Sequence, residues 1–161
     1  MGVAINNPDL ARLLVKKGAD VNLTQAGGES PLELAASLCE INLVRFLLRR
    51  GAKINHADLD GVTPLHSAAQ GCDSGEMIVL LIANGASLNA RDKLGNTPLM
   101  AAAFRDNIKA AQELLEAGAD YATKNRAGET AVDIACDTRL GRKDQRDNFC
   151  SRVRGFLSIG K

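Results

Sequence analysis

Gly61-Val62-Thr63-Pro64-Leu65-His66-Ser67-Ala68-Ala69 is the stretch that decides the fold, because three variants of it occur elsewhere in the chain. The hydroxyl residues of the four copies are Ser30, Thr63, Thr97 and Thr130, so the steps are 33, 34 and 33 residues. A second marker, a Gly-Ala pair, keeps the same period and occurs at residues 18–19, 51–52, 85–86 and 118–119. Two markers in phase predict an array of stacked repeats.

With these two markers, the chain resembles the ankyrin-repeat proteins along nearly its whole length. The resemblance implies an all-α fold, an ankyrin-repeat α-solenoid of stacked helix-turn-helix units with projecting β-turn or hairpin loops. We expect a single domain over residues 1–161. Its parts are a partial first repeat at 1–24, three full repeats at about 25–57, 58–91 and 92–124, and a C-terminal capping repeat at 125–161.

Local signals agree with this division into repeats. Ser30 has the character of a helix N-cap, Pro31 suits the first helical position, and Glu33 completes a capping box. Asp58 and Gly61, like the Asp-Gly pair at 92 and 95, stand at the first and fourth positions of a type I turn. Each repeat is therefore predicted to begin with a projecting turn, followed by a helix.

Both ends of the chain depart from the pattern. Residues 7–18 read as an outer helix without its inner partner, so we expect a fragment cut inside its first repeat, with Leu10, Leu13 and Leu14 partly exposed and self-association through this end. A capping helix is predicted over 144–158. Residues 139–161 also carry seven Lys and Arg against two acidic residues, interpreted as a solubilising surface, with an anionic partner as the alternative.

Composition limits the function classes. Aromatic residues make up 3% of the chain, so the core must be thin and built from small aliphatic side chains. The net charge is +1, which gives no overall argument for a nucleic-acid or membrane partner. We see neither a secretion signal nor a stretch long enough to span a membrane, and expect a cytoplasmic location.

The four cysteines, at 39, 72, 136 and 150, show no zinc-ligand spacing. Cys39 and Cys72 occupy equivalent places in neighbouring repeats, where stacked helices would hold them about 10 Å apart. That separation is too large for a disulfide. We therefore expect four reduced structural thiols.

The sequence contains no catalytic or phosphate-binding motif. A nucleophile elbow and a phosphate loop are both missing, and His66 stands where the resemblance implies a structural hydrogen-bonding role. We expect no enzyme activity, no cofactor and no metal. The resemblance implies a protein-protein interaction module that binds through its concave face and turn tips. The alternatives are a regulatory or targeting arm of a larger enzyme, and a module that inhibits an enzyme.

The resemblance also implies which residues face the partner: those beside each turn glycine and at the end of each inner helix. Several are apolar where exposure is expected, with cations around them, which is the usual anatomy of a protein interface. The alternative is that Leu59 and Leu94 merely pack against neighbouring turns. The predicted partner-binding residues are Leu59, Asp60, Val62, Arg91, Lys93, Leu94, Asn96, Phe104, Arg105 and Arg126.

Overall fold

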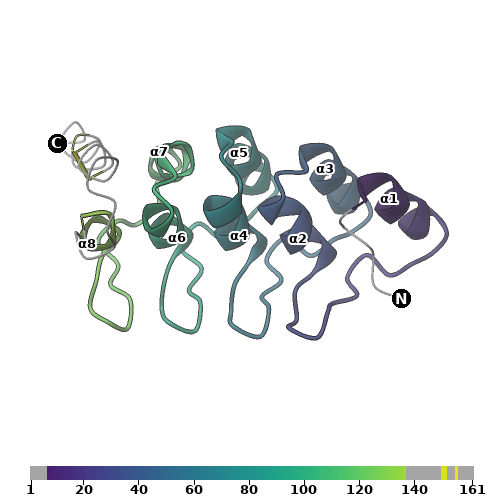
Figure 1. The fold of residues 1–161 in the computed structure, drawn as a ribbon, viewed down its shortest axis with the longest axis horizontal. Helices are drawn as coiled ribbons and strands as arrows, with labels where there is room; N and C mark the ends of the chain where they lie inside the picture. The colour runs from purple at the N-terminus through teal and green to yellow at the C-terminus, as the bar shows by residue number, and fades with distance from the viewer. Residues whose placement is uncertain (1–6, 137–149, 152–154, 156–161) are drawn as a thin grey trace.

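The computed structural model describes residues 7–136, 150–151 and 155, and the described part contains helices and loops but no strand. Helices α2, α4, α6 and α8 form one row of inner helices, and α1, α3, α5 and α7 form an outer row beside it (Figure 1). The predicted all-α solenoid is confirmed. The helices are α1 (Pro8–Lys16), α2 (Pro31–Ser37), α3 (Ile41–Arg49), α4 (Pro64–Gly71), α5 (Gly75–Ala83), α6 (Pro98–Phe104), α7 (Ile108–Glu116) and α8 (Ala131–Ala135).

The inner helices begin at the predicted hydroxyl residues. Ser30 Oγ accepts a hydrogen bond from the Glu33 backbone N–H at 3.1 Å, and Thr97 caps α6 in the same way. At α4 a side chain of the first turn also bonds back to the capping residue. His66 Nδ1 accepts a hydrogen bond from the Thr63 backbone N–H at 3.2 Å. The caps satisfy backbone donors that a helix leaves unpaired at its start, so each copy of the repeated stretch fixes one helix start.

The core is thin, as the composition requires. Each inner helix packs against the next through fully buried alanines and one large aliphatic residue, such as Leu32 in α2 and Leu65 in α4. The small side chains allow close stacking. The closest approach is at Gly71, where an added Cβ would lie 2.5 Å from the Ser37 carbonyl oxygen.

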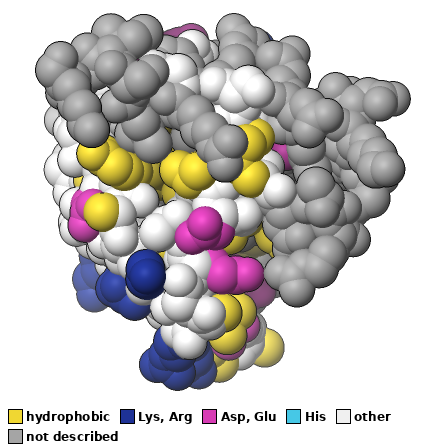
Figure 2. Space-filling model, turned by 90° about the vertical axis from the view of Figure 1, so that its left-hand side faces the viewer, with side chains coloured by type: hydrophobic (Ala, Val, Ile, Leu, Met, Phe, Trp, Pro, Cys, Tyr) yellow, Lys and Arg dark blue, Asp and Glu magenta, His cyan; other side chains and the backbone are white. Residues whose placement is uncertain are grey.

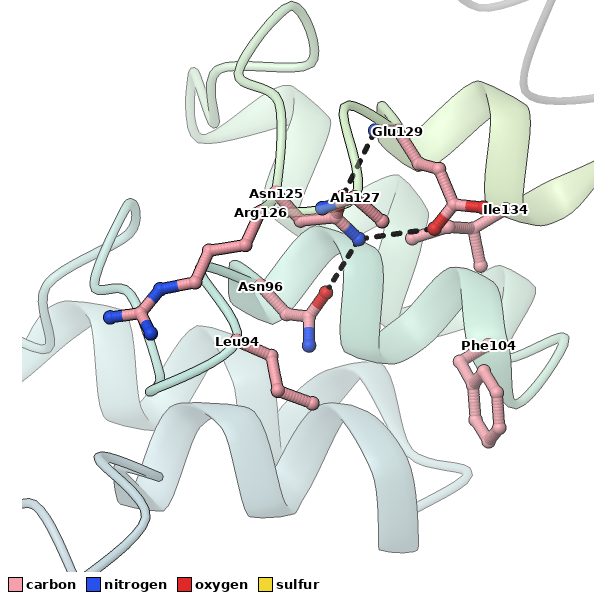
Figure 3. A pocket seen from close by; sticks show the side chains of 8 residues that line it. All are labelled: Leu94, Asn96, Phe104, Asn125, Arg126, Ala127, Glu129 and Ile134. Atoms are coloured by element: carbon pink, nitrogen blue, oxygen red, sulfur yellow. Dashed lines mark hydrogen bonds between the residues drawn. The ribbon is translucent and has the colours of Figure 1, made fainter.

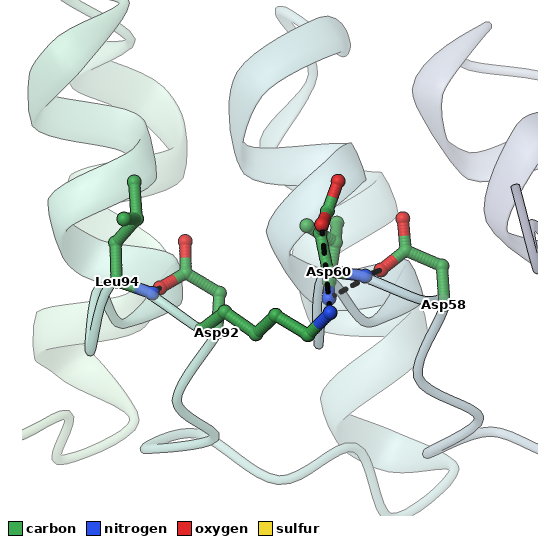
Figure 4. Close-up of polar contacts among 6 residues, drawn as sticks. Asp58, Asp60, Asp92 and Leu94 are labelled. Carbon is green, nitrogen blue, oxygen red and sulfur yellow. Dashed lines mark hydrogen bonds and ion pairs between the residues drawn. The ribbon is translucent and has the colours of Figure 1, made fainter.

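Four projecting turns, here called the finger loops, comprise residues 25–28, 58–61, 92–95 and 125–128. Asp58 Oδ1 accepts from the backbone N–H groups of Asp60 and Val62, both at 2.8 Å, and the Asp92 carboxylate closes its own turn in the same way (Figure 4). The Gly61 N–H donates to the Asp58 carbonyl at 3.1 Å. This is the predicted type I turn.

Neighbouring finger loops are joined to one another by backbone hydrogen bonds. The N–H of the second residue in each loop donates to the carbonyl of the third residue in the loop before it. These bonds are Leu59 to Gly27 at 3.0 Å, Lys93 to Asp60 at 2.7 Å, and Arg126 to Leu94 at 2.9 Å. The finger loops therefore form a continuous row rather than independent projections.

Asparagines hold the opposite ends of the repeats together. The Asn22 side chain donates to the Gly51 carbonyl at 3.2 Å and accepts from the Lys53 N–H at 2.9 Å. Asn55 makes the same pair of bonds to the carbonyl of Gly85 and the N–H of Ser87. Because each amide spans two repeats, it fixes the distance between them.

The prediction of four reduced cysteines was wrong. Cys39 and Cys72 form a disulfide with their Cα atoms 4.8 Å apart, and Cys136 and Cys150 form a second with Cα atoms 5.1 Å apart. Cys39 and Cys72 both lie just after the ends of inner helices. The spacing between stacked helices therefore does not set the distance between the two Cα atoms. Cys39 adopts a φ of 61°, and Gly71 lets the two chain segments approach closely.

The predicted exposure of leucines on the first helix is confirmed for two of the three. Leu10 and Leu13 are exposed on α1, and Leu14 is half-buried, whereas Ala11 and Val15 pack into the core. Self-association through this end stays a prediction. The predicted helix over 144–158 and the basic cluster at 139–161 lie outside the described residues, apart from 150–151 and 155.

Candidate functional site

A hollow in the described surface lies across the fourth and fifth repeats. A cavity of about 350 Å³ is lined on its apolar side by Leu94 from a finger loop, Phe104 from the end of α6 and Ile134 from α8 (Figure 3). A neighbouring cavity of about 240 Å³ shares these three residues and Asn96. The two cavities adjoin, since they share four lining residues. We call the pair the trough and define it by those four residues, Leu94, Asn96, Phe104 and Ile134.

The polar side chains beneath the trough are bonded to one another. The Asn125 amide nitrogen donates to Asn96 Oδ1 at 3.0 Å and to Glu129 Oε2 at 3.2 Å. Asn96 in turn donates from its amide nitrogen to Asp92 Oδ2 at 3.0 Å. The amides of Asn96 and Asn125 are thus bonded to neighbouring side chains, and Leu94, Phe104, Ala127 and Ile134 leave the rest of the larger cavity mainly apolar.

Three of the four predicted apolar residues are exposed, and the fourth, Val62, is half-buried. Leu94 is 65% exposed, Leu59 is 62% exposed and Phe104 is 52% exposed. Leu94, Phe104 and Asn96 come together in the trough, with Arg126 at its edge. Leu59 and Val62 do not line it. Leu59 lies against the preceding finger loop, since an added Cβ on Gly28 would lie 3.2 Å from Leu59 Cγ.

Of the predicted cations, Arg126 lines the trough, and Arg91, Lys93 and Arg105 lie within three residues of Leu94 or Phe104 in the sequence. The Arg91 guanidinium lies close to Gly95, since an added Cβ on Gly95 would be 2.7 Å from Arg91 Nη2. The same Nη2 donates to the Lys124 carbonyl oxygen at 2.8 Å. Lys93 Nζ lies 3.9 Å from Asp60 Oδ1, and both side chains are well exposed, so this pair is weak. Arg105 and Arg126 are exposed. Seen from the C-terminal end, Lys and Arg side chains gather where the finger loops project (Figure 2).

Sequence reasoning found only Arg126 among the residues that the fifth repeat contributes. The trough and its edge also include Asn125, Ala127, Glu129 and Ile134. A signal for two of them was present, because Ala127 and Glu129 flank the turn glycine Gly128 as Leu94 and Asn96 flank Gly95. Ile134 lies on α8 four residues after the cap Thr130, and the sequence pattern did not show that this position lines the trough.

Two titratable side chains are buried between repeats. Glu33 is 4% exposed, and its Oε1 accepts from Ser67 Oγ at 3.2 Å, while Oε2 has no hydrogen-bond partner among the described residues. Burial, reinforced by the nearby Asp58 carboxylate, raises the pKa of Glu33 to about 7. Burial lowers the pKa of His66, whose Nε2 lies 3.1 Å from the Asn96 carbonyl oxygen. His66 thus has the structural role expected of it.

The described part of the chain holds neither a candidate metal site nor a candidate membrane span. No group of three or more His, Cys, Asp or Glu side chains there could hold a metal ion. Among the same residues, no helix is both long enough and apolar enough to cross a membrane.

Known proteins agree with the repeat architecture. A sequence profile described as "Ankyrin repeats (3 copies)" matches residues 1–92 and 65–144, and the chain belongs to the ankyrin-repeat family. It is similar to Inversin from Gallus gallus, with 33% identity over 63 residues. That segment is 39% of this chain and 6% of inversin's length.

Proposed function

We propose that this chain is a protein-binding module whose binding surface is the trough and the finger loops beside it. The observation that carries the proposal is the exposure of Leu94 and Phe104 over a cavity in which the amides of Asn96 and Asn125 are bonded to neighbouring side chains. Exposed apolar side chains that gather around a hollow, with cations at the rim, are typical of interaction sites. Ankyrin repeats are generally protein-protein interaction modules.

We further propose that the chain has no enzyme activity of its own. The residues around the trough include neither a paired nucleophile and base nor a histidine. The narrower roles of enzyme inhibitor and of regulatory arm of a larger enzyme stay predictions, because each depends on the partner. A cytoplasmic location also stays a prediction, and the two disulfides weigh against it, since disulfides persist mainly in oxidising compartments.

Selection from a random peptide display library tests the binding proposal. Peptides are selected on the native protein and then measured against a Leu94→Ser/Phe104→Ala variant. A Val79→Ser variant is the matched control, because Val79 is an exposed apolar residue on the outer helix α5. We expect the trough variant to weaken binding at least about tenfold and the control to leave it unchanged. The opposite pattern, or a library without binders, would contradict the proposal.

A further inference from the structure

The binding site is divided by charge along the row of finger loops. Glu29, Asp58 and Asp60 lie on or beside the first two finger loops, whereas Arg91, Lys93, Lys124 and Arg126 lie on or beside the last two. Arg105 adds a further cation just after α6, next to Phe104. The trough lies at the cationic end of this row.

The two carboxylates on or beside the last two finger loops, Asp92 and Glu129, accept hydrogen bonds from within the protein. The Asp92 carboxylate accepts from the N–H groups of Leu94 and Asn96 at 2.9 and 2.7 Å and from the Asn96 amide at 3.0 Å. Glu129 accepts from Asn125. By contrast, Arg105 and Arg126 make no ion pair with any residue in the described part. The cations are therefore the groups left to meet a partner's charges.

The size of the trough limits what enters it. Cavities that take small-molecule ligands span about 300–1,000 Å³. The larger cavity here, about 350 Å³, lies at the low end of that range and shares four lining residues with the smaller one. One or two bulky apolar side chains fill such a space. Its walls of Leu94, Phe104 and Ile134 favour an apolar group over a polar one.

From this combination we propose that the trough binds a peptide segment with a bulky apolar anchor flanked by acidic residues. The apolar anchor occupies the space between Leu94, Phe104 and Ile134. The acidic flanks meet Arg105 at one end and Arg126 with Lys93 at the other. This inference rests on the proposed function and adds the chemistry of the partner.

Three labelled octapeptides test the assignment by fluorescence anisotropy. The first has Leu-Phe at its centre with two glutamates on each side and a glycine at each end. The second replaces the glutamates by lysines, and the third replaces Leu-Phe by Ser-Ser. We expect the first to bind at least about tenfold more tightly than the other two. Raising NaCl from about 50 to about 500 mM should weaken its binding, because salt screens the rim charges.

Paired variants locate the charge effect. Arg105→Gln/Arg126→Gln should weaken the glutamate peptide at least about fivefold. The control Lys16→Gln/Arg49→Gln removes the same charge from exposed positions on the outer helices and should have little effect. Equal or tighter binding of the lysine peptide, an equal effect of both variants, or no binding of the glutamate peptide would overturn the acidic assignment.

The two proposals fail in different ways. If the octapeptides do not bind but display-selected peptides still depend on Leu94 and Phe104, the trough is a protein-binding site and only the partner chemistry is wrong. If the glutamate peptide binds equally well to Leu94→Ser/Phe104→Ala, the site itself lies elsewhere on the protein.

Discussion

The Asn125 side chain donates a hydrogen bond to Asn96 Oδ1, 3.0 Å away, and so joins the fifth repeat to the fourth directly beneath the trough. The same amide nitrogen donates to Glu129, while Asn125 Oδ1 accepts from the backbone N–H groups of Ala127 and Glu129 at 3.0 and 2.9 Å. One side chain thus closes a finger loop and sets the position of the trough wall.

Asn125→Asp separates these two roles. The carboxylate keeps the acceptor that closes the turn, as Asp58 and Asp92 do at the equivalent positions, but it removes the donor to Asn96 and places a second negative charge beside Glu129. We expect a loss of about 1–3 kcal/mol in the free energy of unfolding, measured by urea denaturation. An unchanged unfolding free energy would show that the amide bonds contribute little.

Glu33 predicts a specific dependence of stability on pH. Its folded-state pKa of about 7 lies above the ordinary 4.5, so its stabilising contribution is complete below pH 4.5 and is lost as the pH rises through 7. Glu33→Gln resembles the protonated carboxyl at every pH. We expect the variant to equal the native protein in melting temperature near pH 4.5 and to melt several degrees higher at pH 8. A difference that does not change with pH would contradict the burial argument.

Two glycines with similar backbone angles should respond differently to the same substitution. Gly51 has a φ of 86° and open space around it, whereas an added Cβ on Gly61 would lie 3.1 Å from the Asp92 Cα and the Lys93 nitrogen. Gly51→Ala should cost roughly 1–2 kcal/mol of unfolding free energy through its backbone conformation alone. Gly61→Ala should cost more, because it also pushes the next finger loop away. Equal losses would mean that the finger loops are not closely packed.

The disulfide between Cys39 and Cys72 predicts a thiol count and a stability change. Denatured protein kept free of reductant should show no thiol that reacts with Ellman's reagent, and four after reduction. Replacing both Cys39 and Cys72 with alanine should lower the unfolding free energy by about 3–4 kcal/mol, the value for a cross-link across 33 residues. Four reactive thiols before reduction would contradict both disulfides and support the expectation of four reduced cysteines.

The sequence predicted the fold well because the fold repeats. Ser30, Thr63, Thr97 and Thr130 each cap an inner helix, and the cap and turn chemistry is local enough to read from neighbouring residues. The finger-loop residues could be located for the same reason, since one rule applied to every repeat puts Leu94 and Asn96 beside the turn glycine Gly95.

Features that depend on spacing between repeats could not be predicted in the same way. The distance between Cys39 and Cys72 depends on a left-handed residue and on the close approach at Gly71. The trough depends on where α8 places Ile134 relative to Phe104. The burial of Glu33 depends on the next repeat, which brings Ser67 and Asp58 to its carboxylate.

Calorimetric titration of a display-selected peptide into native protein and into Leu94→Ser/Phe104→Ala tests the central claim most directly. Both side chains are largely exposed, so the variant should melt within about 2 °C of the native protein. Its Kd should rise at least about tenfold, equivalent to about 1.4 kcal/mol. An unchanged Kd in a variant that remains folded would contradict the claim and place the binding surface elsewhere on the solenoid.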